Sequence, residues 1–289
     1  MEISFACWLL LASFGASAFG STLGMASGIF IVPILTLFFG IDMHIAIGAS
    51  LVSVIACSCG SASFFLKNRL TNIRLAIVLE IATTLGALTG VFLIGIIPTL
   101  YLYILFSAIL ILSAQQMLAQ RNEFVQADTP ADRSSWATLL RLHSSIPNYR
   151  LGQNVPYQVG CIPLGLCLMY GAGLISALLG IGSGVLKIPA MDTVLRLPIK
   201  VSSATSNFMI GVTAAASAGA YFVRGDINIA IAGPVALGSV LGSLTGGRLL
   251  MSLPSEKLRI LFAAILALLA IPMLMSVFGF NAFQGLRHE

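Results

Sequence analysis

Apolar residues fill ten long stretches of this chain, and short polar loops separate most of them. A helix that crosses a membrane needs about 20 mostly apolar residues. The stretches at 28–40 and 184–196 are too short, so we predict that each forms a short helix paired with the stretch before it. The ten stretches are 4–20, 28–40, 44–66, 72–95, 98–119, 160–178, 184–196, 200–222, 228–247 and 256–279.

The second half of the chain repeats the first at an offset of 156 positions (180 − 24 = 156) without a gap. The segment GALTG at 86–90 coincides with GSLTG at 242–246, and ILFSAILIL from Ile104 coincides with ILFAAILAL from Ile260. Single residues that coincide include Gly24 and Gly180, Ser27 and Ser183, Gly28 and Gly184, Pro33 and Pro189, and Ser50 and Ser206. Such a repeat indicates a duplicated structural unit. We predict a first transmembrane repeat at 1–119, a cytoplasmic connecting segment at 120–157 and a second repeat at 158–289.

Composition places the chain in a membrane. Of its 289 residues 58% are hydrophobic and only 9% are charged, whereas soluble domains carry about 25% charged residues. We therefore predict an all-α polytopic membrane protein of the inner (plasma) membrane. The net charge of +5 does not indicate a nucleic-acid partner, because the basic residues lie in short loops, where they set topology.

Those loop charges favour inverted repeats. With an odd number of crossings in each half, twelve loop Lys and Arg residues face the cytoplasm and two face out; with an even number the split is nine to five. The positive-inside rule selects the odd arrangement, which places both termini outside. The twelve are Lys67, Arg69, Arg74, Arg121, Arg133, Arg141, Arg150, Arg196, Lys200, Arg248, Lys257 and Arg259, and the two are Arg224 and Arg287. The parity leaves open whether each short helix pair crosses the membrane or re-enters it.

The N-terminal segment and the connecting segment each carry a signal that differs from a plain membrane span. Ala16-Ser17-Ala18 resembles a signal-peptidase site, but Glu2 replaces the usual positive charge. Gly15-Ala16 repeats at Gly171-Ala172, so this segment belongs to the duplicated unit and we expect it to be retained. In the connecting segment, Asp128 precedes Trp136, Leu139 and Leu140. This pattern fits either a capped, partly amphipathic helix at the inner surface or a plain linker.

Two glycine-rich breaks are the strongest candidates for a binding site. They read GSTLGMASG at 20–28 and SALLGIGSG at 176–184, and each is followed by a proline, Pro33 or Pro189. Ser27 and Ser183 are suitable N-cap residues for the short helices that follow. A helix N-terminus attracts anions through its free N–H groups, so two inverted breaks meeting near the midplane would form an anion site. The alternative is that these glycines only permit close packing.

Polar residues inside the apolar stretches add to this site. Ser50, Ser206 and Asn207 can donate hydrogen bonds to a substrate, or the serines can instead satisfy helix backbone. Lys187, whose counterpart is Ile31, is an ionisable residue in the first turn of a short helix; it either offsets an anionic substrate or reaches the interface. Glu80 can pair with Lys187 or relay protons, and we take it as the candidate for ion coupling.

Other motifs are missing or structural. The chain has no GxxxxGK[ST] loop, no H-E-x-x-H and no Ser–His–Asp pattern, and its five cysteines lie in apolar stretches without metal-ligand spacing. We therefore expect neither an enzyme nor an ATPase, and neither a cofactor nor a metal. The GxxxG steps Gly86–Gly90 and Gly242–Gly246 are typical helix-packing faces.

The duplicated motifs resemble the TauE/SafE family of sulfite exporters and anion permeases. The resemblance rests on GSTLGMASGIFIVPIL and ISALLGIGSGVLKIPA, each followed by a segment of the type A-x-x-x-S at 46–50 and, more loosely, at 202–206. The family usually has glycine where this chain has Ser27 and Ser183. The resemblance implies transport of sulfur-containing or other small organic anions without ATP hydrolysis.

These observations lead to one principal expectation about function. We expect a secondary transporter that moves sulfite, thiosulfate or an organic sulfonate by alternating access around a midplane site. Its expected partners are the lipid bilayer and a candidate coupled ion, either a proton or another ion. An anion channel and a membrane assembly protein are the alternatives. The oligomeric state, the substrate and the direction of transport stay open at this stage.

Overall fold

The computed structural model describes residues 3–22, 27–67, 70–94, 96–118, 139–140, 142, 144–148, 153–249 and 255–277. The first set of helices is α1 (Ile3–Thr22), α2 (Gly28–Pro33), the π-helix η1 (Ile34–Phe38), α3 (Met43–Lys67), α4 (Ile73–Ile94) and α5 (Thr99–Leu118). The second set is α7 (Ile162–Leu179), α8 (Gly184–Thr193), α9 (Ile199–Val223), α10 (Ile229–Leu249) and α11 (Ser255–Val277). These bounds agree with the ten apolar stretches to within three residues, which confirms the polytopic α-helical architecture.

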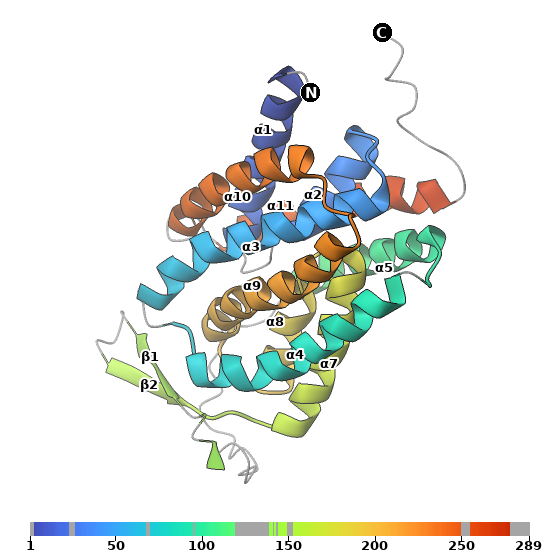
Figure 1. Ribbon diagram of the computed structural model, residues 1–289. Helices are drawn as coiled ribbons and strands as arrows, with labels where there is room; N and C mark the ends of the chain where they lie inside the picture. Colours follow the sequence, from blue (N-terminus) through green and yellow to red (C-terminus); the bar gives the residue numbers. More distant parts are fainter. Residues whose placement is uncertain are drawn as a thin grey trace.

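The two sets of helices correspond at the offset seen in the sequence. The α2–η1 pair begins at Gly28 and α8 begins at Gly184, and α3 and α9 begin at Met43 and Ile199; both differences are 156 residues (184 − 28 and 199 − 43). Figure 1 shows α3 and α9 side by side through the centre of the molecule, with α1 and α10 on one side and α4 and α7 on the other. The short helix α8 packs against α9, and α2 packs against α3.

Helices from opposite halves pack together through glycine. On α4, a Cβ added to Gly90 would meet the Leu174 carbonyl of α7, and one added to Gly86 would meet the Tyr170 carbonyl. On α10, Gly242 and Gly246 lie in the same way against the Phe14 and Ala18 carbonyls of α1. Close backbone approach through small residues is how helices associate in lipid. The prediction that both GxxxG steps are packing faces is therefore confirmed.

The outward faces of the helices are apolar. On α4 the buried face carries Leu79, Glu80 and Thr83, whereas large apolar side chains face outward. Within the described residues, five helices are long and apolar enough to cross a membrane: they are Ser4–Ser21, Met43–Lys67, Ile73–Ile94, Ile162–Leu179 and Ile229–Gly246. The exposed apolar residues of α4 are Ile73, Ile77, Ile81, Leu85, Leu88 and Phe92. This arrangement is that of a multi-pass membrane protein.

A β-hairpin in the connecting segment was not predicted. Strand β1 (Ser144–Asn148) pairs antiparallel with β2 (Gln153–Tyr157), and the hairpin lies beside the beginning of α4 at one end of the molecule (Figure 1). Asn72, just before α4, donates from Nδ2 to the Tyr157 hydroxyl at 2.9 Å and to the Leu142 carbonyl at 3.0 Å. The helix considered for this segment falls mostly outside the described residues.

Candidate functional site

The two glycine breaks lie against each other. Gly28 opens α2 so close to the second break that an added Cβ would lie 2.9 Å from the carbonyl carbon of Ile181 and would overlap the carbonyl oxygen of Gly180. Gly180 ends α7 in the left-handed conformation with φ of 64°, which glycine adopts without steric cost. Ser50 on α3 donates a hydrogen bond of 2.6 Å to the Gly180 carbonyl. Gly24, the counterpart of Gly180, lies outside the described residues.

The serines at the two helix starts are in N-cap position, but neither caps its helix. Ser27 and Ser183 precede α2 and α8, and neither side chain makes a capping hydrogen bond. Ser27 has φ −60° and ψ −21°, which is helical geometry, whereas a capping serine usually takes extended geometry. Instead its hydroxyl forms a hydrogen bond of 2.8 Å with Ser53 Oγ. Ser53 Oγ forms a second hydrogen bond, with Ser239 Oγ on α10. The prediction of side-chain capping was wrong.

Three buried polar groups of the second half have no partner. Ser183 Oγ, at the second break, and Ser206 Oγ and Asn207 Nδ2, both on α9, are buried and have no hydrogen-bond partner. The position that corresponds to Ser53 is Met209 (53 + 156 = 209), which cannot continue a hydroxyl chain. A buried polar group without a partner costs about 1–3 kcal/mol. A polar ligand that reached any of these groups would gain a hydrogen bond.

A buried charged cluster joins α4, α8 and α9 beside this break. Lys187 Nζ lies 3.2 Å from Glu80 Oε2 and donates a hydrogen bond of 2.8 Å to Thr213 Oγ1. Thr213 in turn donates to Glu80 Oε1 at 2.5 Å. Thr83 and Thr84, one turn along α4, donate to the same carboxylate at 3.0 and 3.3 Å. The Lys187 side chain is fully buried, and that of Glu80 is 11% exposed.

Because Lys187 and Glu80 are buried, each depends on the other for charge compensation. An unpaired charge in low dielectric is strongly unfavourable, so a buried lysine and glutamate must neutralise each other. The pair Arg224–Asp226, at 3.1 Å, has side chains that are 37% and 24% exposed and contributes little, because water screens it. Lys187 therefore lies in the protein interior, and the alternative that it reaches the interface is wrong.

Both prolines lie in the short helices that follow the breaks. Pro33 is the last residue of α2, and the chain continues from it as the π-helix η1. Pro189 lies inside α8. Because proline cannot donate a backbone hydrogen bond, each one loosens the short helix that follows a break.

Several residues of the site were missed by sequence reasoning. Thr213, Ser53 and Ser239 have no striking neighbours in the sequence, and hydroxyl residues are common in membrane helices. One signal was present for Thr213. Buried hydroxyl residues recur along one face of α9 with spacings of four and seven residues, at Ser202, Ser206, Thr213 and Ser217. Such spacing places all four on one side of a helix.

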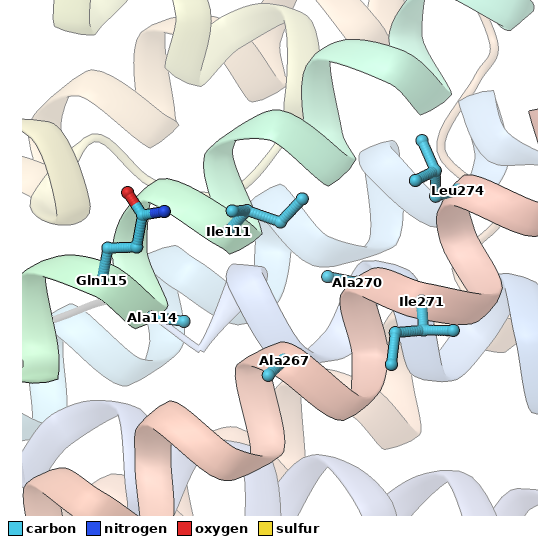
Figure 2. A pocket seen from close by; sticks show the side chains of 7 residues that line it. All are labelled: Ile111, Ala114, Gln115, Ala267, Ala270, Ile271 and Leu274. Atoms are coloured by element: carbon cyan, nitrogen blue, oxygen red, sulfur yellow. The ribbon is translucent and has the colours of Figure 1, made fainter.

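An apolar cavity lies elsewhere in the described part of the molecule. It has a volume of about 320 Å³ and lies between α5 and α11. Figure 2 shows its lining, in which Gln115 is the one polar side chain. The lining residues are Ile111, Ala114, Gln115, Ala267, Ala270, Ile271 and Leu274. A groove of this composition offers an anion no compensating charge, so we do not take it as the binding site.

The fold and this site define a class: a polytopic α-helical membrane protein that encloses a buried, charge-paired cluster beside two broken helices. The chain belongs to the family described as sulfite exporter TauE/SafE, whose model matches residues 9–273. Family membership confirms the resemblance found in the sequence and makes the chain a membrane transporter.

Individual relatives agree with this assignment. The chain is 24% identical over 241 residues to the "Probable membrane transporter protein YunE" of Bacillus subtilis, covering 81% of this chain and 83% of that protein. It is 23% identical to the "Probable membrane transporter protein YdhB" of the same organism, covering 82% and 87%. A shorter match, 31% identical over 113 residues, covers 36% of this chain and 18% of the "Probable membrane transporter protein MamO" of Magnetospirillum gryphiswaldense. No solved structure matches the chain significantly.

Proposed function

We propose that the chain is a secondary transporter of the inner membrane that moves a small anion, such as sulfite, thiosulfate or an organic sulfonate, by alternating access. One observation carries this proposal: the two glycine breaks meet next to the short helix that holds a fully buried lysine, and Ser183 at the start of that helix is a buried hydroxyl without a partner. Buried ionisable residues and broken helices in a membrane protein mark substrate pathways.

In this proposal the two breaks have different tasks. At the second break Ser183, and on α9 Ser206 and Asn207, donate hydrogen bonds to the anion, and Lys187 supplies the compensating charge. The amide groups of Gly184 and Val185 precede the first hydrogen bond of α8, in which Leu186 N–H donates to the Ser183 carbonyl, so they add partial positive charge.

The first break supports the second from the other half of the chain. Ser27, Gly28 and Ser50 already make contacts within the protein, so we assign them, together with Pro33, to holding the break in place. Pro189 does the same for α8. Movement of one half against the other would then open the site to each side of the membrane in turn.

We further propose that the halves have inverted topology. The loop charges support this arrangement, and the reciprocal packing of α1 on α10 and of α4 on α7 fits a two-fold relation between the halves. Single cysteines at Asn68 and Gly225, in a variant that lacks the five natural cysteines, are expected to react with an impermeant thiol reagent from opposite faces of the membrane. Reaction of both from one face would exclude inverted repeats.

Flux through proteoliposomes tests the function. The purified full chain is expected to catalyse saturable uptake of labelled thiosulfate, sulfite or sulfoacetate, with competition among the anions that bind. Uptake that does not saturate and that carries a steady current at a fixed voltage would favour the anion-channel alternative. Absence of flux for all three anions would overturn the proposed substrate class.

A further inference from the structure

Among the described residues of the site, Lys187 is the one cation, and its ammonium group already has hydrogen-bond partners. Its ammonium group donates to Glu80 and to Thr213, and Glu80 accepts from Lys187, Thr213, Thr83 and Thr84. The carboxylate therefore has a nearly complete set of hydrogen bonds, and the pair carries no net charge. An anion that enters the site meets a lysine whose charge has been cancelled.

Charge balance then decides what must happen when the anion binds. Placing a negative ion beside a neutral buried pair leaves one uncompensated negative charge in low dielectric, which is strongly unfavourable. If the Glu80 carboxylate takes up one proton from water, the O–H group is neutral and the positive charge of Lys187 is left to the anion. The sum of anion, lysine and protonated glutamate is again zero for a monovalent anion.

The neighbours of the pair allow this exchange. Protonated Glu80 keeps acceptor capacity for the threonine hydroxyls, so the carboxyl group stays hydrogen-bonded after Lys187 leaves. Lys187 lies one helical turn after Ser183, whose hydroxyl has no partner. A lysine side chain is long and rotates freely, so it can turn from Glu80 toward an ion at the start of α8.

No other ionisable group competes within the described part of the surrounding helices. Glu80 is the charged neighbour that acts on Lys187. Arg74, Cys167 and Tyr170 are exposed, and the Tyr221 hydroxyl donates to the Ala177 carbonyl. The remaining titratable residues on α8 and α9 are Asp192 and Lys200, which lie toward the connection between these helices.

We propose that Glu80 and the transported anion compete for Lys187, so that each monovalent anion is carried together with one proton taken up by Glu80. This inference rests on the proposed function and assigns the coupling ion and the residue that carries it. The transporter is then a proton–anion symporter, and the proton gradient can drive accumulation of the anion.

Two measurements on the full-length protein test this coupling. In detergent, binding of an organic sulfonate of fixed single charge, such as isethionate, is expected to remove about one proton per bound anion from an unbuffered solution. Its apparent Kd is expected to rise about tenfold per pH unit in the range where Glu80 is ionised before binding, because linked proton and anion binding obey reciprocal linkage. In proteoliposomes, an inward proton gradient is expected to drive accumulation of the same anion.

The substitution Glu80→Gln separates coupling from transport. Because Gln cannot ionise, E80Q is expected to bind the anion with a Kd independent of pH and to exchange labelled for unlabelled anion, but not to accumulate it under a proton gradient. The control variant Asp226→Asn breaks the exposed ion pair with Arg224 and is expected to behave as the wild type.

The outcomes distinguish the two proposals. Accumulation driven by the proton gradient that persists in E80Q would overturn the coupling and leave the transport function intact. Proton uptake on anion binding that is equal in E80Q and in the wild type would do the same. Absence of both binding and flux in the wild-type protein for every anion tested would overturn the proposed substrate class and, with it, the coupling.

Discussion

The two glycine breaks share an origin in the duplicated sequence but differ in how their polar groups are satisfied. At the first break, the hydroxyls of Ser27 and Ser53 contact each other, whereas the corresponding Ser183 at the second break has no partner. On the long helices, Ser50 of α3 donates to the Gly180 carbonyl, whereas the corresponding Ser206 of α9 has no partner. The first arrangement minimises the cost of buried polar groups, whereas the second retains that cost.

The charged residues follow the same division. Lys187 corresponds to Ile31 (187 − 156) and Glu80 corresponds to Ala236 (80 + 156). A neutral version of the cluster therefore exists within the same chain, at the equivalent place in the other half. Duplication explains the scaffold, and the substitutions that break the symmetry mark where a ligand and an ion act. Residues that retain an energetic cost are expected at functional sites.

The largest effect is expected where the two breaks touch. In Gly28→Val, the new Cβ would lie 2.8 Å from Ser50 Oγ and 2.9 Å from the Ile181 carbonyl carbon, so the backbone of one half must move. We expect flux in proteoliposomes to fall to background. Gly171→Val is the matched control, since nothing lies within 4 Å of a Cβ added there, and its flux is expected to stay near that of the wild type. Normal flux in Gly28→Val would show that this contact has no role in transport.

Breaking the charged pair from one side is expected to have the next largest effect, on stability. Lys187→Met leaves Glu80 buried without its counter-charge, and such a loss costs about 3–5 kcal/mol. Adding Glu80→Gln restores neutrality, as in the other half of the chain, and is expected to recover most of the stability. The measurement is the thermal unfolding midpoint in detergent for both single variants and the double variant. Additive effects in this double-mutant cycle would show that the pair is not coupled.

The two N-cap serines are expected to respond in opposite ways. Ser183→Ala removes an unpartnered hydroxyl, so we expect little loss of stability, but a weaker apparent Kd for the anion, by about 1 kcal/mol or roughly fivefold. Ser27→Ala breaks the contact with Ser53 and is expected to cost about 1 kcal/mol of stability without a change in Kd. The measurements are thermal unfolding and equilibrium binding for both variants. Equal changes in stability and in Kd would show that the two breaks are equivalent.

The elements that could be predicted from the sequence are those that obey a strong local rule. Apolar stretches define the helices because a membrane span admits little else, and Lys187 and Glu80 were found because charges in such stretches are rare. Thr213 was missed because a hydroxyl residue in a membrane helix is ordinary. Ser53 and Ser239 were missed because their contact joins helices far apart in the chain, and no periodicity records such a contact.

The hairpin shows the same limit in another form. Its strands contain Ser144, Pro147 and Pro156. Proline is rare within strands, because it removes a hydrogen bond from the ladder, so these sequences do not resemble strands. The pairing is supported by contacts outside the hairpin, from Asn72 to Tyr157 and to Leu142. Tertiary contacts of this kind override local preference. The local sequence alone therefore predicts a linker and not a hairpin.

The smallest effect on stability is expected at Asn72 and Asn228, which occupy corresponding positions in the two halves of the chain. Each accepts from a backbone N–H at the start of its helix, Leu75 at 3.2 Å and Ala230 at 3.0 Å, but only the buried Asn72 also holds the hairpin. Tyr157→Phe removes one of those bonds and is expected to cost about 0.5–1.5 kcal/mol, whereas Asn228→Ala is expected to lose only the cap.

This last contact also carries a pH dependence. Burial raises the pKa of Tyr157 above its ordinary value of 10.0, against the smaller opposing effect of the hydrogen bond from Asn72. A group that ionises less readily in the folded protein stabilises the fold fully below its unfolded pKa, and that contribution is lost as the pH rises through the folded pKa. Docking of the hairpin is therefore expected to be constant up to about pH 10 and to weaken at higher pH, as measured by limited proteolysis within 144–157. The same pH profile in Tyr157→Phe would show that this hydroxyl does not control docking.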